Sequence, residues 1–203
     1  VSPTIVSCTF SNNMDAIDID MGGGRVADCL FIHNRDDCID LSSSWTLIED
    51  NRIHSFGDKG ISVGEKSRPV IFNNVITHAA MAIAVKDLST TLILNNTLVS
   101  NRTAVAVYRK KISFGPATAS LVNNILHFNG RAIETDQGST VTARYNSAST
   151  QLSGKGNSTA VPGFEPGTLR LRRNDILSSS GSGKPPSFYG LPGDKPIRQV
   201  GHF

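Results

Sequence analysis

The chain has few cysteines, few aromatic residues and no long hydrophobic run. Three cysteines are too few, and odd in number, for a miniprotein held together by disulfides. No apolar run approaches the roughly 20 residues that a helix needs to cross a bilayer, so no membrane insertion is expected. The 20 lysines and arginines nearly balance the 17 aspartates and glutamates. The basic residues are scattered and are not interleaved with aromatic ones, so nucleic acid is not an expected partner.

The chain is long enough, at 203 residues, to form one domain with a substantial core. Isoleucine, valine and leucine are abundant over most of its length, which excludes disorder there. Val1 leads directly into a structured pattern without a signal peptide. We therefore expect this chain to be a fragment of a longer protein.

A 22-residue repeat runs through the first two thirds of the chain. Its copies are short segments of alternating apolar residues, centred on Ile17, Ile39, Ile61, Ile83 and Val105. A sixth copy, centred on Ile133, comes later than this period requires, and an insertion at 110–117 accounts for the extra length. A second short apolar segment precedes each copy, and no helical periodicity is present.

One such unit cannot bury its own apolar face, whereas stacked units bury a continuous apolar column. Strands of successive units would then pair in parallel, about 4.8 Å apart. The predicted fold is all-β, a right-handed parallel β-helix (a solenoid) with about six 22-residue rungs over residues 1–139. Over residues 140–203 we expect a last irregular rung and then a tail rich in glycine, serine and proline. This tail would pack on the solenoid and cover its end, because open strand edges promote aggregation.

Asparagine recurs at one position of the repeat. Asn51, Asn74, Asn96 and Asn124 share this position, which predicts a stacked amide ladder that satisfies backbone groups of the turns. Cys8 and Cys29 occupy the same position two rungs earlier, and we expect buried, stacked thiols there rather than a disulfide. Cys38 lies at another position and is interpreted as a small packing residue.

Acidic residues recur in the first rungs. Asp15, Asp37 and Lys59 follow one another at the spacing of the repeat, so they should stack at one edge of one face. Alternation turns Asp18 outward, and Asp40 should stack on it, so the acidic patch would be about 10 Å across. Carboxylates this close repel one another and need compensation. Three possibilities are open: a Ca²⁺ ion, shared protons as in hydrolases, or backbone N–H groups of the turns.

Two runs resemble the pectate-lyase-like β-helix superfamily: residues 35–40 (RDDCID) and residues 57–65 (GDKGISVGE). The order Asp, then Asp-Asp-x-x-Asp, then Lys is similar to polysaccharide lyase family 9. The resemblance implies four Ca²⁺ ligands, which are Asp15, Asp36, Asp37 and Asp40. It implies Lys59 and Asp37 as catalytic residues, with Lys59 as the base. The other interpretation of Lys59, an ion pair with Asp37 or Asp58, stays open.

Such an enzyme would cleave an acidic polysaccharide by β-elimination, which removes the weakly acidic C5 proton of a uronic acid. Bound Ca²⁺ would stabilise the anion that forms. On later rungs, Lys86, Arg109 and Lys110 are predicted to bind the anionic sugar chain. A polysaccharide partner suggests an extracellular or cell-surface protein.

Two other functions remain open. Asp15, the pair at 36–37 and residues 60–64 also resemble glycoside hydrolase family 28, the polygalacturonases, in which paired aspartates carry out inverting hydrolysis. Lys59 stands where that family has a histidine. The third possibility is a non-catalytic carbohydrate-binding or surface module. His33, His54 and His78 fall in turns at irregular offsets and predict neither a metal site nor a catalytic triad.

Overall fold

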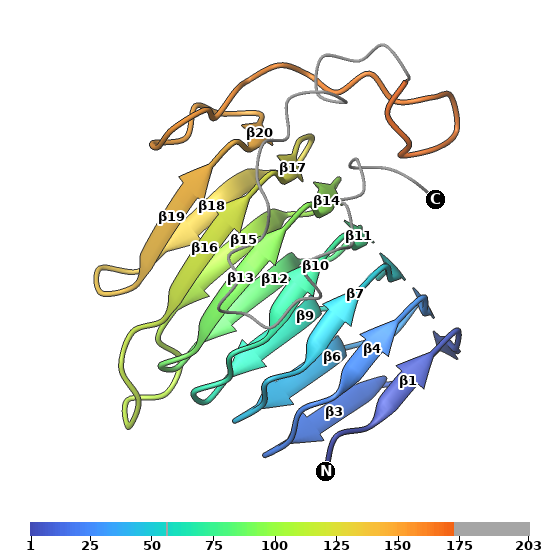
Figure 1. Ribbon diagram of the computed structural model, residues 1–203, viewed down its shortest axis with the longest axis vertical. Helices are drawn as coiled ribbons and strands as arrows, with labels where there is room; N and C mark the ends of the chain where they lie inside the picture. The colour runs from blue at the N-terminus through green and yellow to red at the C-terminus, as the bar shows by residue number, and fades with distance from the viewer. Residues whose placement is uncertain (56, 173–203) are drawn as a thin grey trace, which may run out of the picture.

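The computed structural model describes residues 1–55 and 57–172. Its described residues form 20 β-strands and no helix. The strands make three sheets, and all pairs within these sheets are parallel (Figure 1). Each strand pairs with the equivalent strands of the coils before and after it. The predicted right-handed parallel β-helix is therefore confirmed.

Each coil contributes one strand to each sheet in turn. Sheet A consists of β1 (Thr4–Val6), β4 (Arg25–Ala27), β7 (Leu47–Glu49), β10 (Val70–Phe72), β13 (Thr90–Leu94), β16 (Thr118–Val122) and β19 (Thr140–Arg144). Sheet B consists of β2 (Thr9–Ser11), β5 (Leu30–Ile32), β8 (Arg52–His54), β11 (Val75–Thr77), β14 (Thr97–Val99), β17 (Ile125–Leu126) and β20 (Ser147–Ala148). Sheet C consists of β3 (Ile17–Asp20), β6 (Asp37–Ser42), β9 (Lys59–Gly64), β12 (Met81–Lys86), β15 (Thr103–Tyr108) and β18 (Arg131–Thr135).

The 22-residue period corresponds to one coil. The register of sheet C places the six repeat centres side by side, in the order Ile17, Ile39, Ile61, Ile83, Val105 and Ile133. Most of this column is completely buried in one continuous core. The longer sixth spacing is taken up between β15 and β16, where the chain leaves the coil and returns. Stacking therefore supplies the burial that a single repeat lacks.

Sheets A and B have seven strands, whereas sheet C has six. The seventh coil, with β19 and β20, is thus formed in two sheets only. Beyond it, an isolated parallel bridge joins Ser147 to Ser158, and an antiparallel one joins Phe164 to Leu171. Of the segment 140–203, in which an irregular rung and a covering tail are expected, residues 173–203 lie outside the described residues.

The corner between sheets A and B repeats the same backbone conformation in every coil. Seven residues with positive φ occupy it: Ser7, Asp28, Asp50, Asn73, Asn95, Asn123 and Tyr145. Asparagine and aspartate are the non-glycine residues that most readily adopt this left-handed conformation. The asparagines of the repeat directly follow five of these corners, and their side chains are buried: Asn51, Asn74, Asn96, Asn124 and Asn146.

The predicted amide ladder is confirmed, and it is longer than predicted. It comprises Asn51, Asn74, Asn96, Asn124, Asn146 and Asn157. The side-chain oxygen Oδ1 of Asn96 accepts hydrogen bonds from the backbone N–H and the side-chain amide of Asn74, at 2.9 and 3.0 Å. The Asn96 amide donates to the carbonyl oxygens of Ile71 and Leu94, at 2.9 and 3.0 Å. Each rung thus satisfies backbone groups that would otherwise be buried without partners.

Cys8, Cys29 and Cys38 are all free, so the prediction of thiols rather than a disulfide is confirmed. Cys29 is buried and continues the ladder, because its backbone N–H donates to the side-chain oxygen of Asn51 at 3.0 Å. The expected burial of Cys8 is wrong, since this thiol is exposed. Cys8 belongs to the first coil, and only one neighbouring coil packs against that coil.

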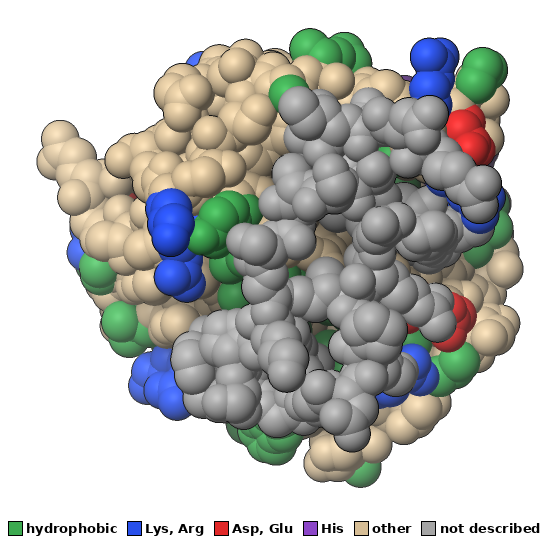
Figure 2. Space-filling view, turned by 45° about the horizontal axis from the view of Figure 1, so that its top comes forward, with side chains coloured by type: hydrophobic (Ala, Val, Ile, Leu, Met, Phe, Trp, Pro, Cys, Tyr) green, Lys and Arg blue, Asp and Glu red, His purple; other side chains and the backbone are tan. Residues whose placement is uncertain are grey.

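On the face drawn in Figure 2, the visible lysine and arginine side chains of the described residues lie at separate places. Within the described part of the chain, we find no helix with the length and apolar character needed to span a membrane.

Candidate functional site

The candidate site lies on the outward face of sheet C, over its first coils. In β3 the side chains of Ile17 and Ile19 are buried, whereas Asp18 and Asp20 are exposed, as the alternation predicts. Parallel register then places Asp18 beside Asp40 on the next coil. Outward side chains of successive coils therefore form rows that run along the solenoid axis.

The structure brings three of the four predicted metal ligands together. One carboxylate oxygen from each of Asp15, Asp36 and Asp37 lies within 4.8 Å of the other two. The backbone N–H of Asp37 donates to Asp15 Oδ1 at 3.0 Å, which ties the first coil to the second. Among residues 1–55 and 57–172, this is the only group of three such ligands. We call Asp15, Asp36 and Asp37 the acidic triad.

The acidic triad fits a calcium ion in ligand type and spacing. Ca²⁺ binds six to eight oxygens at about 2.3–2.6 Å, so two oxygens on the same ion are at most about 5 Å apart. The triad oxygens meet this limit. Three ligands leave coordination positions open for water or for a carboxylate of a substrate. The triad would thus bind one side of such an ion and leave the other side of the ion open.

Asp40, the fourth predicted ligand, lies in the neighbouring row. It pairs in register with Asp18 and Ser62, and its Oδ1 accepts a hydrogen bond from the backbone N–H of Leu41 at 3.1 Å. It is not part of the acidic triad. Asp40 therefore adds negative charge beside the triad without being placed as one of its ligands.

Lys59 lies directly beside Asp37 on the next coil. Its Nζ is 3.1 Å from Asp37 Oδ1, and it forms a second ion pair with Asp58. Lys59 is only 4% exposed and Asp37 only 6%. Burial by itself favours a neutral lysine, but the bonds and charges of Asp58 and Asp37 outweigh it and raise the pKa of Lys59. Lys59 is therefore protonated and ion-paired in this arrangement.

For Asp37, burial outweighs the effect of the neighbouring charge on the pKa. Burial raises the pKa of the Asp37 carboxyl, and the nearby Lys59 ammonium only partly offsets this effect. The negative charge of Asp37 thus depends on a neighbouring cation. Lysine supplies that cation on one side, and the open side faces Asp15 and Asp36.

The three predicted sugar-binding residues lie in two different environments. Lys86, at the end of β12, is 6% exposed, and its Nζ donates to Ser62 Oγ at 2.8 Å. Burial lowers the pKa of Lys86. Arg109 and Lys110 are exposed in the insertion that follows β15. The structure therefore places Lys86 within the face of sheet C and the other two at its edge.

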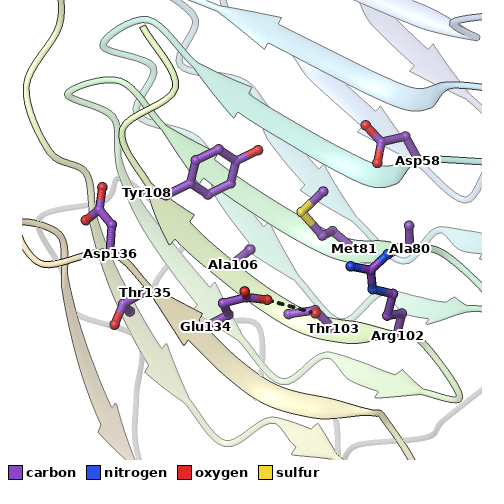
Figure 3. A pocket seen from close by; sticks show the side chains of 10 residues that line it. All are labelled: Asp58, Ala80, Met81, Arg102, Thr103, Ala106, Tyr108, Glu134, Thr135 and Asp136. Atoms are coloured by element: carbon purple, nitrogen blue, oxygen red, sulfur yellow. Dashed lines mark hydrogen bonds between the residues drawn. The ribbon is translucent and has the colours of Figure 1, made fainter. Parts of the chain in front are cut away.

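A pocket of about 360 Å³ opens on the same face, over β12, β15 and β18 (Figure 3). Its lining residues are Asp58, Ala80, Met81, Arg102, Thr103, Ala106, Tyr108, Glu134, Thr135 and Asp136. Asp58 belongs both to this pocket and to the ion pair with Lys59, so the pocket adjoins the acidic site. Arg102 and Glu134 were not predicted from the sequence. The sequence feature that could have indicated a pocket there is the small outward residue Ala106, which lies beside Glu134 in register.

The three histidines that fall at irregular offsets in the sequence lie close together. The rings of His33 and His54 are 6.2 Å apart, and those of His54 and His78 are 4.7 Å apart. His54 lies in β8, whereas His33 and His78 follow the ends of β5 and β11 with positive φ. Burial and the two neighbouring histidines lower the pKa of His54. Their spacing is irregular because strand and corner positions are combined.

The sequence matches the family model of the right-handed beta helix region over residues 2–114. This match spans more than half of the chain, so the protein belongs to the right-handed β-helix family. No curated protein matches the sequence. Fold and family together identify a β-helix protein of the carbohydrate-active or structural kind.

Proposed function

We propose that the protein is a Ca²⁺-dependent, polysaccharide-lyase-like enzyme that cleaves an acidic glycan by β-elimination at the outward face of sheet C. The observation that carries this proposal is the acidic triad with Lys59 in contact with one of its members. Such an elimination requires a cation site and a base, and Lys59 would serve as that base only in its neutral form.

The charge around the triad supports cation binding. Burial and the charges of Asp20 and Asp40 raise the pKa of Asp18, which indicates an excess of negative charge on this face. A divalent cation relieves this repulsion. Once bound, Ca²⁺ would neutralise a uronate carboxylate and stabilise the negative charge that develops beside it.

In the proposed reaction, Lys59 accepts the C5 proton of a uronate residue. The electrons of the C–H bond form a double bond between C4 and C5, the bond from C4 to the glycosidic oxygen breaks, and that oxygen takes a proton from solvent. Lys59 must be neutral to act as a base. When Asp37 is shared with a cation, Lys59 keeps only Asp58 as a carboxylate partner, and its neutral form becomes more accessible.

Lys86 is the second lysine on this face and a direct comparison for Lys59. Its hydrogen-bond partner is the neutral Ser62 hydroxyl, and burial lowers its pKa. Lys59→Met should abolish elimination, and Lys86→Met should mainly weaken substrate binding. If Lys86→Met loses elimination and Lys59→Met keeps it, the base is Lys86 and not Lys59.

Inverting hydrolysis by paired aspartates is the second candidate. The raised pKa of Asp37 suits an acid that donates a proton. However, inverting enzymes keep their two carboxyl groups roughly 6.5–9.5 Å apart to admit water. The triad oxygens lie within 4.8 Å of one another, a spacing that favours a shared cation instead.

The test begins with Ca²⁺ binding, measured by calorimetry for the wild type, Asp15→Asn and Asp37→Asn. Asp28→Asn, at an exposed corner between sheets A and B, is the matched control. Binding should be lost in the first two variants and kept in the control. The same proteins are then mixed with polygalacturonate and with alginate. Ultraviolet-absorbing, unsaturated products that disappear with chelator would support the lyase.

Other outcomes separate the alternatives. Reducing ends that form without ultraviolet absorbance and persist with chelator would indicate a hydrolase. Absence of Ca²⁺ binding at millimolar concentration would overturn the proposed mechanism. Absence of any product, with the protein folded, would favour a structural β-helix module.

A further inference from the structure

The pocket on sheet C takes no part in the elimination described above, although it adjoins the acidic site. It exists because the outward row of sheet C has small side chains at this point. The row reads Asp18, Asp40, Ser62, Ala84, Ala106 and Glu134. Ala106 lies between the larger side chains of Thr103 and Tyr108 on the same strand, and it forms the floor of the pocket.

Two side chains stand on opposite sides of this floor. Figure 3 shows the Tyr108 ring on one side of Ala106 and the Arg102 guanidinium on the other. Tyr108 is half-buried, whereas Arg102, which directly precedes β15, is exposed. An aromatic ring opposite a planar cation is suited to a ligand with an apolar face and an anionic substituent.

The carboxylates of the pocket already have partners. Asp58 pairs with Lys59. Glu134 accepts from Arg131 Nη1 and from Thr103 Oγ1, each at 3.2 Å. These pairings use much of the negative charge on the pocket walls.

The Asp136 carboxylate also has hydrogen-bond partners. Its oxygens accept the backbone N–H groups of Arg109 at 2.7 Å and Ser139 at 2.8 Å. Arg102, by contrast, forms no ion pair within the described part of the chain. The pocket therefore presents one available cation, which selects for a single anionic group.

We propose that this pocket binds one uronate ring of the acidic glycan, with its carboxylate on Arg102 and its ring against Tyr108. The inference rests on the proposed function and adds a specificity-determining subsite to it. The volume of about 360 Å³ is near the lower end of the roughly 300–1,000 Å³ typical of small-molecule sites, which suits a single sugar ring. The paired carboxylates provide acceptors for sugar hydroxyl groups.

The position of the pocket defines how the glycan lies. Asp37 on β6 and Thr103 on β15 belong to one outward row, three coils apart. At about 4.8 Å per coil, this is about 14 Å along the solenoid axis. The sugar chain thus runs across the strands, from the acidic triad to Arg102, and an oligomer of several rings is needed to contact both.

The test is calorimetry with tetramers of galacturonate, mannuronate and guluronate, with maltotetraose as the neutral comparison, all in excess chelator. At least one uronate tetramer should bind more tightly than maltotetraose. Its affinity should fall at least tenfold in Arg102→Gln, which is exposed and should not disturb folding. Ala106→Leu, which fills the floor, should give a similar loss. Arg144→Gln, an exposed arginine on β19 of sheet A, should have no effect.

Each other result has one meaning. An unchanged affinity of Arg102→Gln for the uronate tetramer would overturn the proposal that this pocket binds a uronate ring. If uronate binding requires Ca²⁺, disappears in Asp15→Asn and ignores Arg102→Gln, the pocket proposal fails while the proposed function stands. If Arg102 governs uronate binding but no unsaturated product ever forms, the subsite stands and the lyase proposal fails. No uronate binding with or without Ca²⁺ would overturn both.

Discussion

Two stacks of polar side chains run through the same solenoid and differ in how they are satisfied. In the asparagine ladder, every member donates to and accepts from a neighbouring coil, and every side chain except the half-buried Asn157 is buried. In the acidic stack, Asp15 and Asp37 lie on successive coils and Lys59 follows on the third. The ladder is neutral and complete, whereas the acidic stack is charged and open on one side.

The difference follows from the chemistry of the side chains. An amide has both donors and acceptors, so identical copies one coil apart can satisfy one another. An ionised carboxylate only accepts, so identical copies repel and need a cation from elsewhere. The same repeat geometry therefore produces a structural element with asparagine and a candidate binding site with aspartate.

The largest effect is expected when the chemistry of the ladder is changed to that of the acidic stack. Asn96→Asp removes the donors to Ile71 and Leu94 and places a carboxyl group among buried acceptors. We expect a loss of about 4 kcal/mol in the free energy of unfolding, measured with urea. Asn12→Asp, at an exposed position, is the control and should change little. A loss below about 1 kcal/mol for Asn96→Asp would contradict the distinction between the two stacks.

A somewhat smaller effect is expected when the acidic stack loses its own cation. Lys59→Met leaves the buried Asp37 carboxylate without its ion-pair partner, and we expect a loss of about 3 kcal/mol at neutral pH. Added Ca²⁺ should restore part of this stability, because it binds the folded triad. Urea unfolding with and without Ca²⁺ measures both changes, and Lys155→Met, which is exposed, serves as control. Unchanged stability, or no response to Ca²⁺, would argue against this role.

A third, smaller effect concerns the pH dependence of stability, to which a buried histidine of the interior contributes. His127 is buried near the ladder, its Nε2 is 2.8 Å from Ser147 Oγ, and burial lowers its pKa. The unfolded histidine has a pKa of about 6.5. The stability that His127 contributes above this pH should therefore be lost as the pH falls through its lower folded value. Urea midpoints between pH 8 and 5 should fall more in the wild type than in His127→Gln. Parallel curves would contradict the prediction.

The smallest effects concern two exposed carboxylates with opposite surroundings. Backbone N–H groups, chiefly that of Arg109, lower the pKa of Asp136 to about 2, whereas burial and acidic neighbours raise the pKa of Asp18. NMR titration of the carboxyl carbons should show Asp136 titrating well below Asp18. If the two titrate together, the acidic face carries no excess charge.

The same two residues should affect stability with opposite signs. Asp136 stabilises above the pKa of about 4 of an unfolded aspartate, and this is lost as the pH falls through about 2. The Asp18 contribution is present at low pH and lost as the pH rises through its raised folded pKa. Asp18→Asn should therefore stabilise slightly at pH 7, by less than about 0.5 kcal/mol because exposed charges are screened. A destabilisation would contradict this sign.

Much of the fold could be predicted because a β-helix is nearly one-dimensional. The 22-residue period translates directly into contact between neighbouring coils, so the pairing of Asp37 with Lys59 followed from counting. The ladder followed in the same way.

The features that the repeat spacing did not predict depend on side chains from several rows of the solenoid. Lys86 is buried because its side chain lies along Ser62 on the previous coil. The histidine cluster joins a strand position to two corner positions, and its members do not share a repeat offset. Cys8 is exposed because burial in a solenoid requires a coil on both sides. Arg102 and Glu134 line a pocket because Ala106, which lies beside Glu134 in register, has a small side chain.

The sequence by itself determined the coil, its period, the inward column of isoleucines and the stacks of asparagine and aspartate, since each depends on one residue meeting its equivalent a repeat away. The tertiary structure decided which carboxylates share a cation-sized space, which lysine is ion-paired and where the face is hollow. These properties depend on the exposure, charge and volume of side chains from at least three coils at once, and no single spacing in the chain encodes them.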